Sequence, residues 1–85
     1  MKVEEGKIEG DITVDEEFQL NGIISGNITV VTGGSLILHG TCLGNLVIER
    51  DALANIHGTV VGDVENQGGK LEVHGTVDGN IVEVD

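Results

Sequence analysis

The sequence predicts an all-β protein: a single-stranded parallel β-helix (a solenoid) of about five coils, each about 16–18 residues long. Three observations support this prediction. One motif repeats five times, the apolar residues alternate with a period of two, and the 85-residue chain contains 14 glycines but no proline, tryptophan or tyrosine. A period of two is typical of strands with one buried face, whereas the apolar residues of an amphipathic helix recur at helical spacing.

The repeated motif is Gly-x-x-x-Gly-(Asp/Asn)-(Ile/Leu/Val). Its copies begin at Gly6, Gly22, Gly40, Gly58 and Gly75. A unit of about 16–18 residues is too short for two helices and their turns, but it suits one coil of three short strands. The array covers nearly the whole chain, so we expect a single β-helix domain over residues 1–85.

Each coil is expected to contribute one strand to each of three faces, taken here in chain order. The first face has the inward column Ile8, Ile24, Cys42, Val60 and Val77, and the second has Ile12, Ile28, Leu46, Val64 and Ile81. The third face has the pairs Phe18/Leu20, Leu36/Leu38, Ala54/Ile56 and Leu71/Val73. Equivalent residues would stack at the ~4.8 Å strand spacing, and no coil buries its apolar face alone.

The paired glycines are expected to form the corners of the coils, where the backbone needs a positive φ or a close approach. These glycines are Gly6, Gly10, Gly22, Gly26, Gly40, Gly44, Gly58, Gly62, Gly75 and Gly79. The column Asp11, Asn27, Asn45, Asp63 and Asn80 suits the same corners, because Asp and Asn tolerate left-handed backbone and form local turns. Coil length varies at the turn before the third face, at residues 32–35, 49–52 and 66–69.

The spacing of the glycines favours a right-handed coil. A left-handed β-helix carries a strict hexapeptide register of small aliphatic residues. Here the two glycines of each motif are separated by three other residues, and the length of the coil is not constant along the chain. We therefore expect a right-handed β-helix.

The composition excludes several classes of partner. Fifteen acidic and four basic residues give a net charge of −11, which repels phosphate backbones, so we expect no binding to nucleic acid. No apolar run approaches the ~18 residues of a spanning helix, so we expect no membrane insertion. The stretch from Met1 to Glu5 lacks the apolar region of a secretory signal, and the single Cys42 cannot form an internal disulfide. These features predict a cytoplasmic protein.

Few residues offer chemistry. His39, His57 and His74 occupy one column before the repeat glycine, but ladder neighbours ~4.8 Å apart place the outer two too far apart to close a tetrahedral zinc site. We expect a solvent-facing ladder without metal, and Cys42, which lies in an inward column, is expected to be a buried inert thiol. No nucleophile, phosphate-binding or Cys-x-x-Cys motif occurs, so we expect neither enzymatic activity nor a cofactor.

Five copies of this motif, evenly distributed along the chain, resemble the bactofilins, bacterial polymer-forming cytoskeletal proteins whose central domain is a right-handed parallel β-helix. The resemblance extends from Gly6 to about Val84. It implies a non-enzymatic scaffold that assembles end to end without a nucleotide, often near the inner membrane.

The two ends of the array differ in charge, and this difference leaves two functions open. Carboxylates crowd the beginning of the chain, at Glu4, Glu5, Glu9, Asp11, Asp15, Glu16 and Glu17. They guard that end against stacking, or they form a surface for a basic protein, as in a soluble immunity or inhibitor protein. The last coil keeps apolar residues at Val77, Ile81 and Val84, so we expect self-assembly there, as a C-terminal dimer or a polymer.

Overall fold

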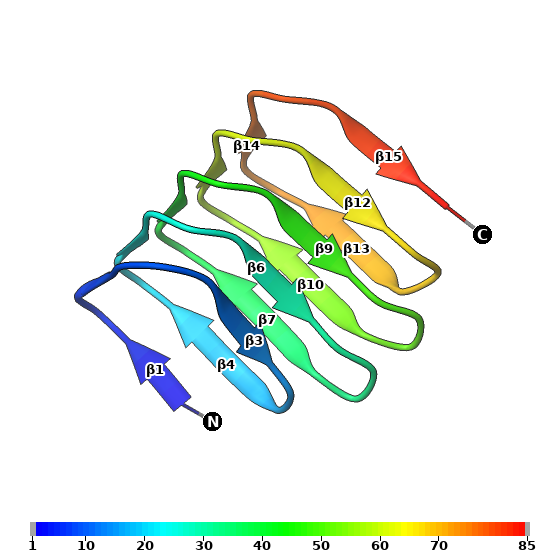
Figure 1. Ribbon diagram of the computed structural model, residues 1–85, viewed down its shortest axis with the longest axis horizontal. Helices are drawn as coiled ribbons and strands as arrows, with labels where there is room; N and C mark the ends of the chain where they lie inside the picture. Colours follow the sequence, from blue (N-terminus) through cyan, green and yellow to red (C-terminus); the bar gives the residue numbers. More distant parts are fainter. Residues whose placement is uncertain (1, 85) are drawn as a thin grey trace.

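The computed structural model describes residues 2–84, which form an all-β solenoid of about five coils with no helix. Three parallel sheets of five strands run along its length (Figure 1). The first sheet contains β1 (Lys2–Glu4), β4 (Glu17–Leu20), β7 (Ser35–Leu38), β10 (Leu53–Ile56) and β13 (Lys70–Val73). The second contains β2 (Lys7–Ile8), β5 (Ile23–Ile24), β8 (Thr41–Cys42), β11 (Thr59–Val60) and β14 (Thr76–Val77). The third contains β3 (Ile12–Val14), β6 (Ile28–Val30), β9 (Leu46–Ile48), β12 (Val64–Asn66) and β15 (Ile81–Glu83).

The register stacks equivalent repeat positions directly on one another. Val60 in β11, for example, pairs with Cys42 in one direction and with Val77 in the other. The inward columns predicted from the sequence are therefore present on all three sheets. The columns of the predicted first, second and third faces lie on the second, third and first sheets, respectively. The third sheet adds an inward column that the sequence analysis did not identify, made of Val14, Val30, Ile48, Asn66 and Glu83.

The core consists of the inward side chains of the middle coils, and these are completely buried. They are Leu20, Ile24, Ile28, Val30, Leu36, Leu38, Cys42, Leu46, Ile48, Ala54, Ile56, Val60 and Val64. The one buried polar side chain among the described residues, Asn66, is satisfied locally: its Nδ2 donates to the Gly69 carbonyl at 3.1 Å, and its Oδ1 accepts the Gly69 N–H at 2.8 Å. The burial of apolar side chains is therefore complete in the middle coils. It is least at the two ends of the solenoid, where the hydrophobic effect contributes least to stability.

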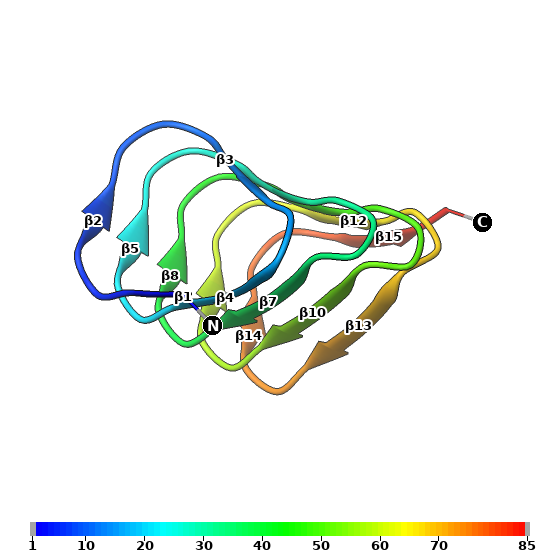
Figure 2. The ribbon, with the colours of Figure 1, turned by 90° about the horizontal axis from the view of Figure 1, so that it is seen from below.

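Seen from the N-terminal end (Figure 2), the chain runs clockwise through β1, β2 and β3 and moves away from the viewer with each coil. This is a right-handed winding, as the glycine spacing favours.

Eight of the ten repeat glycines lie at corners where successive coils touch. A Cβ atom on Gly40 would lie 1.7 Å from the carbonyl oxygen of Gly22, and one on Gly62 would lie 2.5 Å from that of Gly44. Only glycine fits such a contact. Of the ten repeat glycines, Gly10 alone has a positive φ, of 94°.

Left-handed backbone occurs mainly at a different turn, the variable one before the first sheet. Gly33, Asp51 and Gly68 occupy equivalent places there, with φ of 88°, 63° and 102°. Asp51 tolerates this conformation because a short polar side chain can stabilise it locally. The conformational freedom of glycine is thus used at the turn where coil length varies.

The Asp/Asn column has a role that differs from the one expected. Its members do not adopt left-handed backbone, and side chains of the column reach the next coil. The Oδ1 of Asn27 accepts the backbone N–H of Asn45 at 2.7 Å, and the Oδ1 of Asn45 accepts that of Asp63 at 2.9 Å. The same bond links Asp11 to Asn27 and Asp63 to Asn80. These bonds join coils at corners where no strand pairing is available.

Candidate functional sites at the two ends of the solenoid

The three histidines form a stack on the outside of the solenoid. The ring centroids of His39 and His57 are 4.9 Å apart, and so are those of His57 and His74, with interplanar angles of 10° and 9°. All three residues are exposed, and the Nε2 of His74 lies 3.5 Å from the Oε1 of Glu72. Parallel rings at this distance direct their nitrogens side by side, which is a poor arrangement for a shared metal ion. Among residues 2–84, no group of three or more His, Cys, Asp or Glu side chains is placed to hold one.

Cys42 lies in the core and is fully buried as a free thiol. Burial raises the pKa of the Cys42 thiol, because the thiolate would lose its hydration. A raised pKa and the absence of solvent contact make this thiol a weak nucleophile.

The N-terminal end begins with an additional strand that the sequence analysis did not identify. β1 pairs with β4 so that Lys2 lies over Phe18 and Glu4 lies over Leu20. Two apolar columns of the first sheet therefore end in charged residues, and the outward Val3 between them is 47% exposed. The signal was present in the sequence, because Lys2-Val3-Glu4 precedes Gly6 at the spacing at which Phe18-Gln19-Leu20 precedes Gly22.

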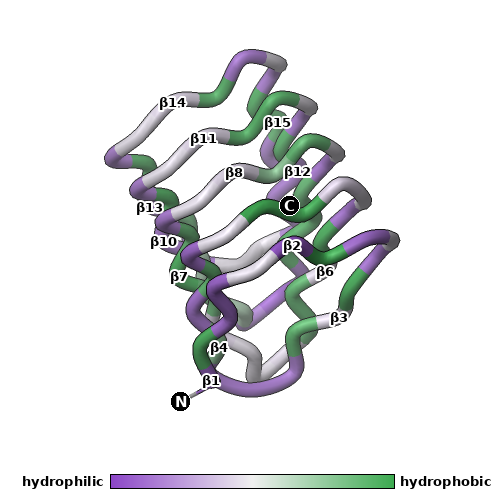
Figure 3. Tube along the Cα trace, turned by 90° about the vertical axis from the view of Figure 1, so that its left-hand side faces the viewer, coloured by the Kyte–Doolittle hydropathy of each residue, from purple (hydrophilic) through white to green (hydrophobic). Residues whose placement is uncertain are grey.

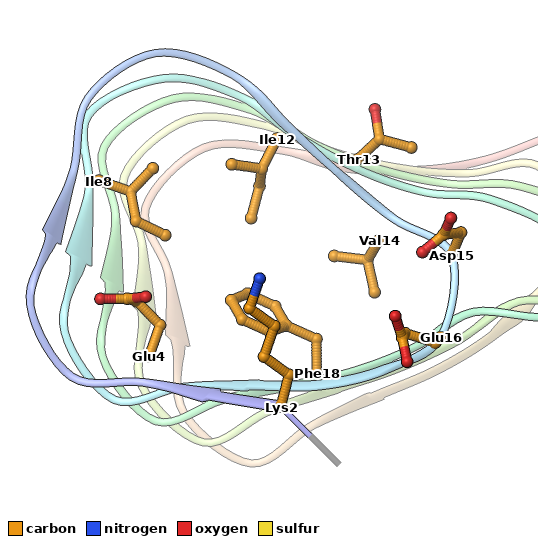
Figure 4. A pocket seen from close by; sticks show the side chains of 9 residues that line it. All are labelled: Lys2, Glu4, Ile8, Ile12, Thr13, Val14, Asp15, Glu16 and Phe18. Atoms are coloured by element: carbon orange, nitrogen blue, oxygen red, sulfur yellow. The ribbon is translucent and has the colours of Figure 1, made fainter.

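Inside the first coil is a recess of about 200 Å³ that opens at the N-terminal end (Figure 4). Its apolar lining comes from Ile8, Ile12, Val14 and Phe18. Val14 and Phe18 are buried, whereas Ile8 and Ile12 are half-buried because no further strand lies over β2 or β3 among the described residues. The polar and charged residues that line the recess are Lys2, Glu4, Thr13, Asp15 and Glu16. We refer to this feature as the N-terminal recess.

The structure distributes the seven predicted carboxylates over several environments. Glu4, Asp15 and Glu16 line the N-terminal recess, and Glu4 is half-buried. Asp11 belongs to the column that bonds to the next coil. Glu5, Glu9 and Glu17 are exposed and lie outside the recess. The hydrophilic turn between β3 and β4, which carries Asp15 and Glu16, is visible at the N-terminal end in Figure 3.

The C-terminal end is an open apolar face. Of the three residues predicted there, Val77 is half-buried, Ile81 is 46% exposed and Val84 is 47% exposed. Leu71 and Val73, at the end of the first-sheet columns, belong to the same face, and Val73 is 38% exposed. We refer to Leu71, Val73, Val77 and Ile81 as the C-terminal face. Glu83 is the charged residue that ends an inward column on this side.

Comparison with protein-family models, with curated proteins and with solved structures found no match to this chain. The described part of the chain, residues 2–84, includes no helix with the length and apolar character to cross a membrane.

Proposed function

We propose that this protein is a non-enzymatic structural scaffold, similar to the bactofilins, that self-assembles through its C-terminal face. The observation that carries the proposal is the contrast between the ends. Two inward columns end in Lys2 and Glu4 at the N-terminal end, whereas four apolar columns end in accessible side chains at the C-terminal end. The edges of β13, β14 and β15 also lie there, and the described residues add no further strand to their sheets. Accessible strand edges with apolar side chains favour pairing with another chain.

We expect the C-terminal face to bind the C-terminal face of a second copy in preference to the N-terminal end of that copy. Head-to-tail stacking would extend the Asp/Asn column, because the Oδ1 of Asn80 would meet the N–H of Asp11, and one such bond contributes about 1 kcal/mol. The same contact would bury the charge of Lys2 against the apolar columns, at a cost of several kcal/mol. Contact between two C-terminal faces leaves Lys2 and Glu4 in solvent and brings one inward charge, Glu83, from each copy to the contact. Head-to-tail contact brings all three of these charges together with the apolar columns, so we expect a two-fold dimer first.

Size-exclusion chromatography with light scattering tests this proposal. We expect the wild-type chain to dimerise with rising concentration and the Ile81→Asp variant to stay monomeric, because the substitution places a charge in the contact. Val82→Asp is the matched control, since Val82 is 48% exposed and neighbours Ile81 on β15 but points outward. If the wild-type chain is monomeric at every concentration, or if both variants behave alike, self-assembly through this face is wrong.

Longer polymers require contact between N-terminal ends, where carboxylates repel. Raising the salt concentration to about 1 M shortens the Debye length to ~3 Å and screens this repulsion. If the protein is a scaffold, its assemblies should therefore become longer as the salt concentration rises. Light scattering and negative-stain microscopy would measure the particle length.

The acidic N-terminal end favours a second candidate function. A soluble acidic module could neutralise a basic protein, because carboxylates presented on a rigid platform attract cationic surfaces. Particles that stay small at every salt concentration would favour this function over the scaffold.

A further inference from the structure

We propose that the N-terminal recess is a docking site for a basic segment of a partner protein that inserts one apolar side chain. The site lies at the end opposite to the C-terminal face, and it does not depend on self-assembly. Three features carry the proposal: the apolar interior of the recess, the charge at its mouth and the position of Lys2.

The interior of the recess matches one apolar side chain in size and character. Its volume of about 200 Å³ exceeds the ~150 Å³ of an engineered aliphatic cavity that binds benzene. Its walls come from Ile8, Ile12 and Val14, and the ring of Phe18 lies in the coil below (Figure 4). Ile8 and Ile12 stay partly accessible, so an inserted side chain would complete their burial.

The mouth of the recess selects a cationic partner. Glu4, Asp15 and Glu16 line it, and four further carboxylates lie in the same N-terminal segment, up to Glu17, of a chain with a net charge of −11. Such a field attracts Lys and Arg and raises the association rate of basic partners. It repels a second copy of this chain, an anionic lipid surface and nucleic acid. A basic segment with one apolar residue therefore fits both the interior and the mouth.

Lys2 occupies the mouth in the unbound protein. Its side chain extends across the opening above Phe18, and its amine points into the recess (Figure 4). No ion pair within 4.0 Å holds this amine among the described residues. The side chain is exposed and can move aside, and its positive charge opposes the entry of a second cation at the mouth.

Two synthetic peptides with the same charge test the inference, KKLKK and KKSKK with blocked ends. Titration at low ionic strength, followed by NMR of the methyl and aromatic groups, should show KKLKK shifting Ile8, Ile12, Val14 and Phe18. The loss of one buried apolar side chain should make KKSKK bind about ten- to a hundredfold more weakly. Equal affinity for both peptides, or shifts spread over the acidic surface without the recess residues, would overturn the proposal.

Matched variants locate the site. Asp15→Asn with Glu16→Gln should weaken KKLKK about two- to thirtyfold, the range of two exposed ion pairs. Asp78→Asn with Glu83→Gln removes the same charge at the far end and should have a smaller effect. Lys2→Gln should strengthen binding, because it removes the opposing positive charge, whereas Lys70→Gln at the far end should not. Equal effects of the two members of either pair would show nonspecific charge attraction and would refute the site.

Discussion

The contacts between repeat glycines decide how closely successive coils approach. Gly58 faces the carbonyl oxygen of Gly40, and Gly75 faces that of Gly58, so the contact repeats along one corner of the solenoid. A Cβ atom at Gly58 would lie 1.9 Å from that oxygen, and the obstruction is backbone, which cannot rotate away. Gly6 begins the same corner without a described coil before it, and a Cβ atom there would meet only the Glu4 Oε2 at 3.5 Å.

The glycine contact predicts opposite outcomes for one substitution at two equivalent positions. Gly58→Ala should destabilise the fold by about 1–3 kcal/mol or more, because the coils must separate to admit the methyl group. Gly6→Ala should leave stability unchanged or raise it slightly, because alanine lowers the entropy of the unfolded chain. Thermal unfolding followed by circular dichroism measures both, and a loss of similar size in the two variants would contradict the close-contact explanation.

The inward and outward positions of a two-residue strand predict a second contrast. Val60 is completely buried in β11, while its neighbour Thr59 points outward and is half-buried. Val60→Asp should cost about 4 kcal/mol or more and unfold the domain, because an unpaired charge would enter the core. Thr59→Asp should leave a folded protein. Equal melting temperatures for the two variants would show that the register is wrong.

At the scale of single elements, the strands are too short to hold the solenoid by themselves. The strands of the second sheet have two residues each, so they contribute few hydrogen bonds. The adjoining corner compensates through the Asp/Asn column, in which one side chain per coil accepts a backbone N–H of the next coil at 2.7–2.9 Å. This column stabilises the corner as a ladder in its own right.

The histidine stack is the other ladder. Its ring centroids are 4.9 Å apart between His39 and His57 and again between His57 and His74, which is the spacing of successive coils. The repeat therefore orders an exposed side chain in the same way as it orders the core columns.

Added zinc tests whether the histidine stack binds a metal ion. We expect added zinc to leave the melting temperature unchanged, because the parallel rings do not converge on one point. A rise in melting temperature with zinc that disappears in His57→Ala would establish a metal site.

For the whole molecule, the proposed self-assembly depends on the charges at the two ends. The apolar columns of the solenoid would continue into a second molecule at either end, except where a charged residue interrupts them. Lys2 and Glu4 interrupt two columns at the N-terminal end, and Glu83 interrupts one at the C-terminal end. Inward-pointing charge on a terminal strand is a known way to prevent association between edges.

Removal of the N-terminal charges should convert the proposed dimer into longer assemblies. Lys2→Ile with Glu4→Val extends the columns of Phe18 and Leu20 with apolar residues. Both ends would then present apolar columns that can pack against another molecule. We expect light scattering to detect large particles at low salt. Glu5→Val with Lys7→Ile removes the same charges from exposed positions on the same coil and should not assemble further. Similar particle sizes for the two double variants would show that inward placement is unimportant.

The coil, its register and most of its core follow from sequence pattern alone. Residues in a strand alternate between two faces, so a period of two together with a repeat of about 16–18 residues identifies inward positions such as Ile24 and Val60 without three-dimensional information. The glycine motif located the corners for the same reason, since repeated local geometry leaves a repeated local signal. The histidine column also followed from the repeat.

The features at the ends and between coils emerge only when the coils are stacked. The partial burial of Glu4, the recess above Phe18 and the accessibility of Val73 depend on which coil lies above or below each residue. The Asp/Asn column likewise bonds to backbone one full coil away. A local pattern is the same whether its neighbouring coil is present or absent. Burial and hydrogen bonding across coils therefore require the stacked structure, and the two proposed interaction surfaces lie on the first and last of the described coils.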